Sequence, residues 1–146
     1  MPSLTYDTSI FISYKPEAFP SGFLMSAVVI QEIVASARDN SELQRWNAAR
    51  RAYEKEGRLI VPDAEDWWMA SKILYWLSKG RRRRVGGKAP RLKLKPGASQ
   101  RMALDALIAV SARRYQAAVV TENWEDFRAI QYYCDFKLIR GSDFFK

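Results

Sequence analysis

The sequence predicts an α/β fold with a central, mainly parallel sheet. Strand-like and helix-like segments alternate along the 146 residues at the spacing of βαβ units, in which a helix connects two parallel strands. The run AAVVT at residues 117–121 is typical of a central strand, and hydrophobic residues make up 48% of the chain, as in a globular protein. We therefore expect one domain over residues 1–146.

The N-terminal segments predict two strands, each followed by a helix. Residues 4–8 predict a short strand, and SIFISY predicts a helix that ends before Pro16. KPEAFPSG holds two prolines and a glycine, which predicts a loop. A strand-like run at residues 23–28 then leads into a helix whose Ile30 and Ile33 recur at helical spacing.

The middle of the chain predicts two helices separated by a strand. NSELQRWNAARRAYEKEG is an amphipathic helix that is capped by Asn40 or Ser41 and stops at Gly57, and RLIVP is a buried strand. DAEDWWMASKILYWLSKG is the next helix, and its broad apolar face either fills a core or pairs with a second copy. The residues of that face are Trp67, Ala70, Leu74 and Leu77, widened by Met69, Ile73 and Trp76, and we expect Trp67, Trp68 and Trp76 to make core or dimer contacts.

The C-terminal segments continue the alternation. We expect a helix at residues 98–116, the strand at 117–121, a helix over NWEDFRAIQYYC and a final strand over FKLIRG. In an open parallel sheet, functional groups gather at the carboxyl ends of the strands. Asp7 ends the first strand and residues 121–126 follow the fourth, so both should lie on one edge of the sheet.

The composition excludes several classes of chemistry. The chain has no histidine and one cysteine, Cys134, which excludes an internal disulfide framework, a zinc site of nitrogen and sulfur ligands and a Ser-His-Asp triad. Any metal site must use oxygen ligands, which favours Mg²⁺, Mn²⁺ or Ca²⁺. No apolar run approaches the roughly 20 residues that span a bilayer, and MPSLTYD is not a secretory signal, so we expect a cytoplasmic protein without membrane contact.

One segment carries the whole excess of positive charge. The net charge is +8, and RRRRVGGKAPRLKLK, within a predicted loop at about residues 81–97, contains eight basic residues and no acids. This density favours binding to a nucleic acid, although a solvated loop or a contact with an acidic protein is also consistent with it. The candidate RNA-binding residues are Arg81, Arg82, Arg83, Arg84, Lys88, Arg91, Lys93 and Lys95.

Two aspartates stand in apolar surroundings. Asp7 lies between two apolar segments, where it either caps the following helix or has a polar or metal partner. Asp105 interrupts MALDALIAV in the middle of the most apolar helix, so capping cannot explain it. An ion pair with Arg101, one turn earlier, is the alternative to a functional role.

Two further acids adjoin the same predicted edge. Glu32 lies near the apolar face of a short helix, although an exposed glutamate is the ordinary interpretation. In TENWEDF, Asn123 could cap the next helix and Asp126 could serve the helix dipole. Convergence of these carboxylates without basic partners would raise their pKa values, and a divalent cation would relieve the repulsion. Such ions activate water and neutralise charge on phosphate, as in nucleases.

The segments YDTSIFI, SAVVIQEI, LDALIAVSA and VVTENWEDF resemble the PIN-domain nucleases, and in particular the VapC-type toxins of prokaryotic toxin–antitoxin pairs. The resemblance covers roughly residues 4–140 and implies a three-layer α/β/α sandwich. It implies an endoribonuclease that depends on Mg²⁺ or Mn²⁺ and leaves 5′-phosphate and 3′-hydroxyl ends. It also implies a homodimer that a small antitoxin protein inhibits, as in type II toxin–antitoxin systems.

The resemblance also assigns roles to residues. Asp7 and Asp105 would hold the metal, and Glu32 with Asp126 would complete its outer shell or hold a second ion. Relatives differ at the fourth position, so Asn123 and Asp126 are both candidates for it. Hydroxyls that would orient ligands or waters are those of Thr8, Ser9 and Thr121. The alternative function is a catalytically silent PIN fold that binds RNA or a protein without cutting.

Overall fold

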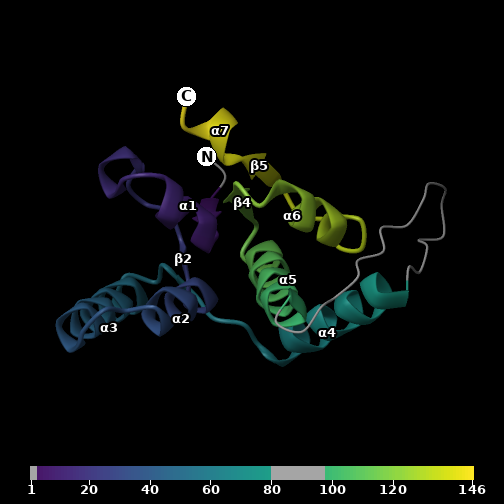
Figure 1. The fold of residues 1–146 in the computed structure, drawn as a ribbon, viewed down its shortest axis with the longest axis horizontal. Coiled ribbons are helices and arrows are strands. Elements are labelled where there is room, and N and C mark those ends of the chain that lie inside the picture. The colour runs from purple at the N-terminus through teal and green to yellow at the C-terminus, as the bar shows by residue number, and fades with distance from the viewer. Residues whose placement is uncertain (1–2, 80–97) are drawn as a thin grey trace.

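Short parallel strands form the centre of the structure, a computed structural model that describes residues 3–79 and 98–146 (Figure 1). The strands are β1 (Ser3–Tyr6), β2 (Met25–Ser26), β3 (Leu59–Ile60), β4 (Ala117–Thr121) and β5 (Leu138–Arg140). The helices are α1 (Thr8–Ser13), the 3-10 helix η1 (Pro16–Ala18), α2 (Ala27–Ala35), α3 (Asn40–Lys55), α4 (Ala64–Lys79), α5 (Ala98–Arg114), α6 (Trp124–Gln131) and α7 (Gly141–Phe144).

The strands follow the order β3-β2-β1-β4-β5, and every pairing is parallel. β1 pairs with β4 and β4 pairs with β5 in one sheet, while β2 and β3 form a second. A single parallel bridge between Thr5 and Leu24 joins the two sheets. From β1 the chain adds β2 and β3 on one side, and it then crosses over to add β4 and β5 on the other side. Open parallel sheets place their ligand sites at such a switch point, which here lies between β1 and β4. The predicted α/β class with a parallel sheet is therefore confirmed.

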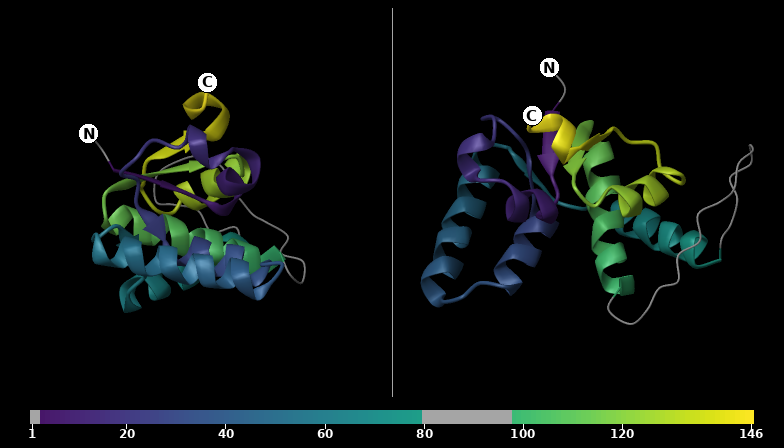
Figure 2. Two further views of the ribbon diagram at one scale, coloured as in Figure 1. Left: turned by 90° about the vertical axis from the view of Figure 1, so that its left-hand side faces the viewer. Right: turned by 45° about the horizontal axis from the view of Figure 1, so that its top comes forward.

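Helices cover both faces of the sheet, which gives three layers. Along β4, Val119 packs into a core with residues of α2, α4, α5 and α6, whereas Val120 packs with Tyr6 and Ile10 on the other face. This alternation follows from the strand geometry, in which neighbouring side chains point to opposite faces. Figures 1 and 2 show α1 and α7 close together on one side of β1 and β4, and α5 on the other.

Four details differ from the expectations. The strand predicted at residues 23–28 is only Met25–Ser26, because the backbone turns into α2 at Ala27. The predicted loop after Pro16 contains η1, and α7 follows the last strand directly. Asp39 caps α3 by accepting a 2.8 Å hydrogen bond from the Glu42 N–H, in place of Asn40 or Ser41. The helix ends at Lys55 with Glu56 as its C-cap, and the expected stop signal, Gly57, follows with a φ of 70°, which suits glycine.

The buried face of α4 agrees with the prediction at Ala70, Ile73 and Leu77 but not at Trp67. Asp66, Ala70, Ile73 and Leu77 are buried, whereas Trp67 is 56% exposed and its neighbour Trp68 is 61% exposed. The expectation for Trp67 was wrong as far as the core of this chain is concerned. Apolar residues surround much of α4, so periodicity alone does not fix where the buried face ends.

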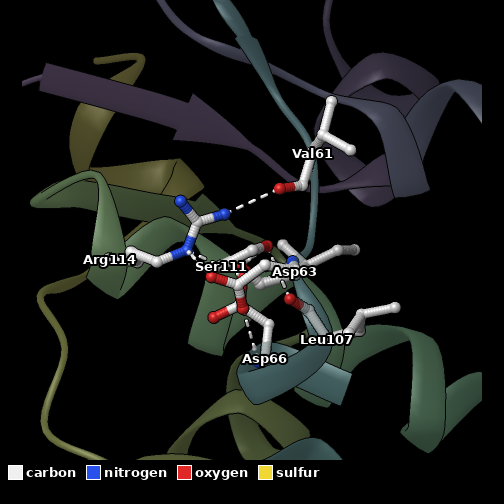
Figure 3. Close-up of polar contacts among 7 residues, drawn as sticks. Val61, Asp63, Asp66, Leu107, Ser111 and Arg114 are labelled. Atoms are coloured by element: carbon white, nitrogen blue, oxygen red, sulfur yellow. Dashed lines mark hydrogen bonds and ion pairs between the residues drawn. The ribbon is translucent and has the colours of Figure 1, made fainter.

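An ionic cluster fixes the start of α4 to the end of α5 (Figure 3). Arg114 Nε lies 3.0 Å from Asp66 Oδ2 and 3.2 Å from Asp63 Oδ2, and its Nη2 donates to the Val61 carbonyl at 2.7 Å. Asp63 and Asp66 also accept hydrogen bonds from each other's backbone N–H groups, at 2.8 and 3.0 Å. The cluster therefore satisfies the first turn of α4 and gives the buried Asp66 a counter-charge.

No helix within residues 3–79 and 98–146 is long and apolar enough to cross a membrane. The basic segment at about residues 81–97 lies outside the described residues.

Candidate active site

Asp7 lies at the carboxyl end of β1 and is buried, with 3% of its surface exposed. Its backbone N–H continues the sheet by donating to the Val120 carbonyl at 3.2 Å. Its carboxylate accepts hydrogen bonds from the hydroxyls of Ser9, at 2.6 Å, and Thr121, at 2.7 Å. Asp7 occupies the N-cap position of α1, but its side chain makes no capping hydrogen bond there. Asp7 is thus the N-cap residue by position, while two hydroxyl groups hold its carboxylate in place.

Asp105 enters the same region from the middle of α5 and is 8% exposed. Its Oδ2 accepts a 3.0 Å hydrogen bond from the side-chain amide of Asn123, in the loop after β4. The ion pairs among the described residues do not include Asp105, so the predicted alternative of a pair with Arg101 does not form.

Asn123 links two carboxylates. Its Nδ2 donates to Asp105 and also to Asp126 Oδ2, at 3.1 Å. The residue stands at the N-cap position of α6 without a side-chain capping bond, and its backbone N–H donates to the Thr121 hydroxyl at 2.8 Å. The expectation that Asn123 caps this helix is therefore wrong. Its amide orients Asp105 and Asp126 instead.

Glu32 reaches the cluster from α2, the helix that follows β2, and β2 is the neighbour of β1 on the side away from β4. Its carboxylate is half-buried and accepts a 2.9 Å hydrogen bond from the Thr8 hydroxyl, at the start of α1. Thr8 belongs to the turn that directly follows Asp7. The hydroxyls of Thr8, Ser9 and Thr121 thus all bond to carboxylates of the cluster.

The carboxylates act on one another electrostatically. Burial raises the pKa of Asp105 to about 8, with further contributions from repulsion by Asp7, Glu32 and Asp126. Burial also raises the pKa of Asp7 to about 6, although the bonds from Ser9 and Thr121 lower it. The pKa of Glu32 is raised by burial and partly lowered by Thr8. The structure thus brings the four predicted acids, Asp7, Glu32, Asp105 and Asp126, within interaction range.

The chemistry of this donor set fits a hard divalent cation. The ion pairs among residues 3–79 and 98–146 include none of the four acids, so within these residues the two buried carboxylates, Asp7 and Asp105, repel each other and have no basic partner. Oxygen ligands of this kind suit Mg²⁺ and Mn²⁺. The described part of the chain contains no group of three acidic or cysteine side chains able to hold an ion by themselves. A site with fewer than three such ligands fits Mg²⁺, because Mg²⁺ is commonly bound through one or two carboxylates and several waters.

A second layer of contacts supports the loop after β4, and two of its residues were not predicted. The Tyr14 hydroxyl donates to the Glu122 carboxylate, and the Glu122 backbone N–H donates to Ser9 Oγ at 3.0 Å. Tyr14 in turn stacks on Phe145, with ring centroids 4.2 Å apart. Tyr14 and Glu122 are 108 positions apart, and no local pattern signals their contact. The predicted RNA-binding residues of the basic segment, Arg81, Arg82, Arg83, Arg84, Lys88, Arg91, Lys93 and Lys95, lie outside the described residues.

Comparison with known proteins identifies the family and the fold. The sequence matches the PIN domain over residues 6–131, and a comparison with curated proteins finds no match. Among solved structures, VapBC-1 from nontypeable Haemophilus influenzae has a TM-score of 0.59 and 17% identity, with 95% of this chain and 98% of the other covered.

Two further structures show the same fold. DNA-bound VapBC from Salmonella typhimurium has a TM-score of 0.58 and 19% identity over 97% of this chain and 99% of the other. FitAcB from Neisseria gonorrhoeae has a TM-score of 0.55 and 15% identity over 95% and 98%. The sequence match spans most of the chain and includes Asp7, Glu32, Asp105 and Asp126. This chain belongs to the PIN-domain family.

Proposed function

We propose that this protein is a metal-dependent endoribonuclease that uses Mg²⁺ or Mn²⁺ and is the toxin component of a type II toxin–antitoxin system. The observation that carries the nuclease proposal is the cluster of four carboxylates at the carboxyl edge of β1 and β4. Two of its members are buried with raised pKa values, and the ion pairs of the described residues leave all four unneutralised. Burying carboxylates that repel one another costs free energy, and a bound cation would offset that cost.

The residues divide into ligands and groups that orient them. Asp7 and Asp105 would hold the ion directly, and Glu32 and Asp126 would bind its waters or a second ion. A bound divalent ion supplies charge neutralisation at the phosphate and activation of water. Ser9 and Thr121 hold the Asp7 carboxylate by its two oxygens, which fixes its orientation before the ion binds. Asn123 does the same for Asp105 and Asp126, and Thr8 does so for Glu32.

The basic segment is proposed to hold the RNA backbone. It supplies the whole positive excess of the chain and lies in the sequence directly between α4 and α5, the helix that carries Asp105. Contacts to phosphates would make RNA affinity fall steeply with salt.

The relatives and the exposed face of α4 support two proposed partners. The neighbours with this fold were solved as VapBC and FitAB assemblies, which supports a small antitoxin protein as a partner of this chain. We also propose a homodimer that uses α4, because Trp67, Trp68 and Tyr75 are 54–61% exposed on this helix. Light scattering after gel filtration should give twice the monomer mass of 16.8 kDa, and a monomeric mass would contradict the dimer.

The nuclease proposal is tested by incubating the protein with structured cellular RNA in Mg²⁺ or Mn²⁺ and in EDTA. We expect discrete cuts that require the metal and that are absent with Asp105→Asn, purified in parallel as a control for contaminating ribonuclease. Binding of RNA without any cutting would favour the alternative of a catalytically silent PIN fold.

A further inference from the structure

We propose that Arg140 and Trp124 form a contact for the RNA backbone beside the carboxylate cluster. The inference rests on the proposed function, since it assigns residues that hold the same substrate. Neither residue belongs to the basic segment or to the acidic set. Both lie on elements that the structure describes, at the edge of the sheet where Asp7 and Thr121 are found.

The register of the sheet places Arg140 at that edge. Arg140 is the last residue of β5 and pairs with Thr121 of β4, whose hydroxyl bonds to Asp7. Side chains alternate along β5, so that Leu138 packs into the core beneath α5 and α6 while Ile139 packs on the opposite face. Arg140 therefore leaves the sheet on the face of Leu138, which is also the face on which α5 carries Asp105.

Trp124 holds the guanidinium of Arg140. The Cζ atom of Arg140 lies 4.6 Å from the centroid of the Trp124 ring, within the range of a cation–π interaction. Trp124 is the first residue of α6 and directly follows Asn123, whose amide bonds to Asp105. Arg128, one turn later, places a second guanidinium 5.9 Å from the same ring.

Arg140 has unused hydrogen-bonding capacity. Its side chain is exposed, and it takes part in none of the ion pairs and side-chain hydrogen bonds found among residues 3–79 and 98–146. A guanidinium held over a ring by a cation–π interaction keeps N–H groups available for a bidentate contact with phosphate. The cation–π interaction also restricts the arginine side chain before it binds, which lowers the entropy lost on contact.

The charge of the edge explains why such a group is needed. The carboxylates of the cluster repel the phosphates of an approaching RNA strand. Without a further positive charge, the bound cation would have to overcome this repulsion by itself. A fixed positive charge on the flank, next to Thr121, offers the neighbouring phosphate a favourable position. The geometry thus fits the phosphodiester backbone of RNA rather than a base-specific contact.

The test measures binding separately from cleavage. All variants carry Asp105→Asn, so that a fluorescein-labelled RNA of about 12 nucleotides stays intact during anisotropy titrations over a series of salt concentrations. Arg140→Ala should weaken binding about tenfold, as expected for the loss of a charge-assisted contact, and should reduce the salt slope by about 0.7. Arg140→Lys should keep the slope and recover only part of the affinity, because it keeps the charge but loses the fork.

Lys137→Ala is the matched control. Lys137 is an exposed cation that directly precedes β5, at the other end of the strand from Arg140. It should change the RNA affinity much less than Arg140→Ala does. Arg140→Gln, which keeps a long polar side chain, replaces the alanine variant if thermal unfolding shows that the latter does not fold.

Equal RNA affinity and equal salt slope for the parent, which carries Asp105→Asn alone, and for the Arg140 variants would overturn the inference. Arg140 would then be a candidate contact for an acidic protein partner. Failure of the parent to bind RNA would overturn the inference together with the proposed function. RNA binding that depends on Arg140, in a protein whose wild-type form does not cut RNA in Mn²⁺, would contradict only the nuclease activity.

Discussion

Replacing Asp105 by asparagine should stabilise the metal-free protein, and the gain should grow with pH. Asp105 has a pKa of about 8 in the folded protein against an ordinary value of 3.8. Between these values the folded protein keeps a proton that the unfolded chain has released, so the free energy of unfolding falls as the pH rises. Below the ordinary value both states are protonated, and the penalty is absent.

The size of the effect follows from the proton difference. One proton corresponds to about 1.4 kcal/mol of unfolding free energy per pH unit, so the wild-type protein should lose about 2–3 kcal/mol from this group between pH 5 and pH 7. Asparagine does not titrate, and its side-chain oxygen can still accept from Asn123. The difference in unfolding free energy between Asp105→Asn and the wild type should therefore widen by that amount.

The assay is urea unfolding followed by circular dichroism at pH 5, 6 and 7, in EDTA. Asp143→Asn serves as the matched control, because it makes the same substitution at an exposed carboxyl in α7, and its curve should parallel the wild type. Parallel pH dependences for Asp105→Asn and the wild type, or a variant that is less stable at pH 7, would refute the view of Asp105 as a buried and repelled carboxyl.

Three further substitutions test contacts that hold the fold together. Tyr6→Phe should leave stability unchanged or raise it by about 1 kcal/mol, since the buried Tyr6 hydroxyl has no partner among the described residues; a loss above that size in thermal unfolding would contradict this. Arg114→Met should cost about 1–2 kcal/mol in urea unfolding, because it removes the counter-charge of the buried Asp66, and an unchanged midpoint would show that the cluster in Figure 3 contributes nothing. Gly141→Ala should destabilise the protein by about 1–3 kcal/mol, because the added Cβ would lie 2.7 Å from Ile10 Cδ1 and closer still to the Glu122 carboxylate; wild-type stability would mean that the Glu122 loop moves freely.

The sequence predicted the parts of the fold that local patterns determine. The apolar run before Thr121 and the turn signals around it locate β4, and the parallel class then places Asp7 and the Thr121 loop on one edge. Helical spacing placed Ala70, Ile73 and Leu77 on the buried face of α4 but could not exclude Trp67 from it, because the exposure of Trp67 depends on which elements pack nearby. A β2 of two residues is too short to be told from the helix that follows it.

The contacts that complete the candidate site depend on tertiary structure. The amide of Asn123 bridges Asp105 and Asp126 only because α5 and the loop after β4 meet, and local sequence favours the capping interpretation instead. Arg140 acquires its place from the pairing of β5 with β4, which no neighbouring residue in the sequence reveals. Acid types and their order along the chain were thus predictable, whereas their hydrogen-bond partners were not.

The central claim, that the carboxylate cluster is a divalent-metal site, is tested most directly by calorimetric titration of the metal-free protein with Mn²⁺. Because burial and repulsion raise the pKa values of Asp7 and Asp105 to about 6 and 8, Mn²⁺ must displace protons from them. We predict saturable binding that strengthens between pH 6 and pH 8, releases protons to the buffer and is lost in Asp105→Asn. Absence of binding, or equal binding by Asp105→Asn, would contradict the account.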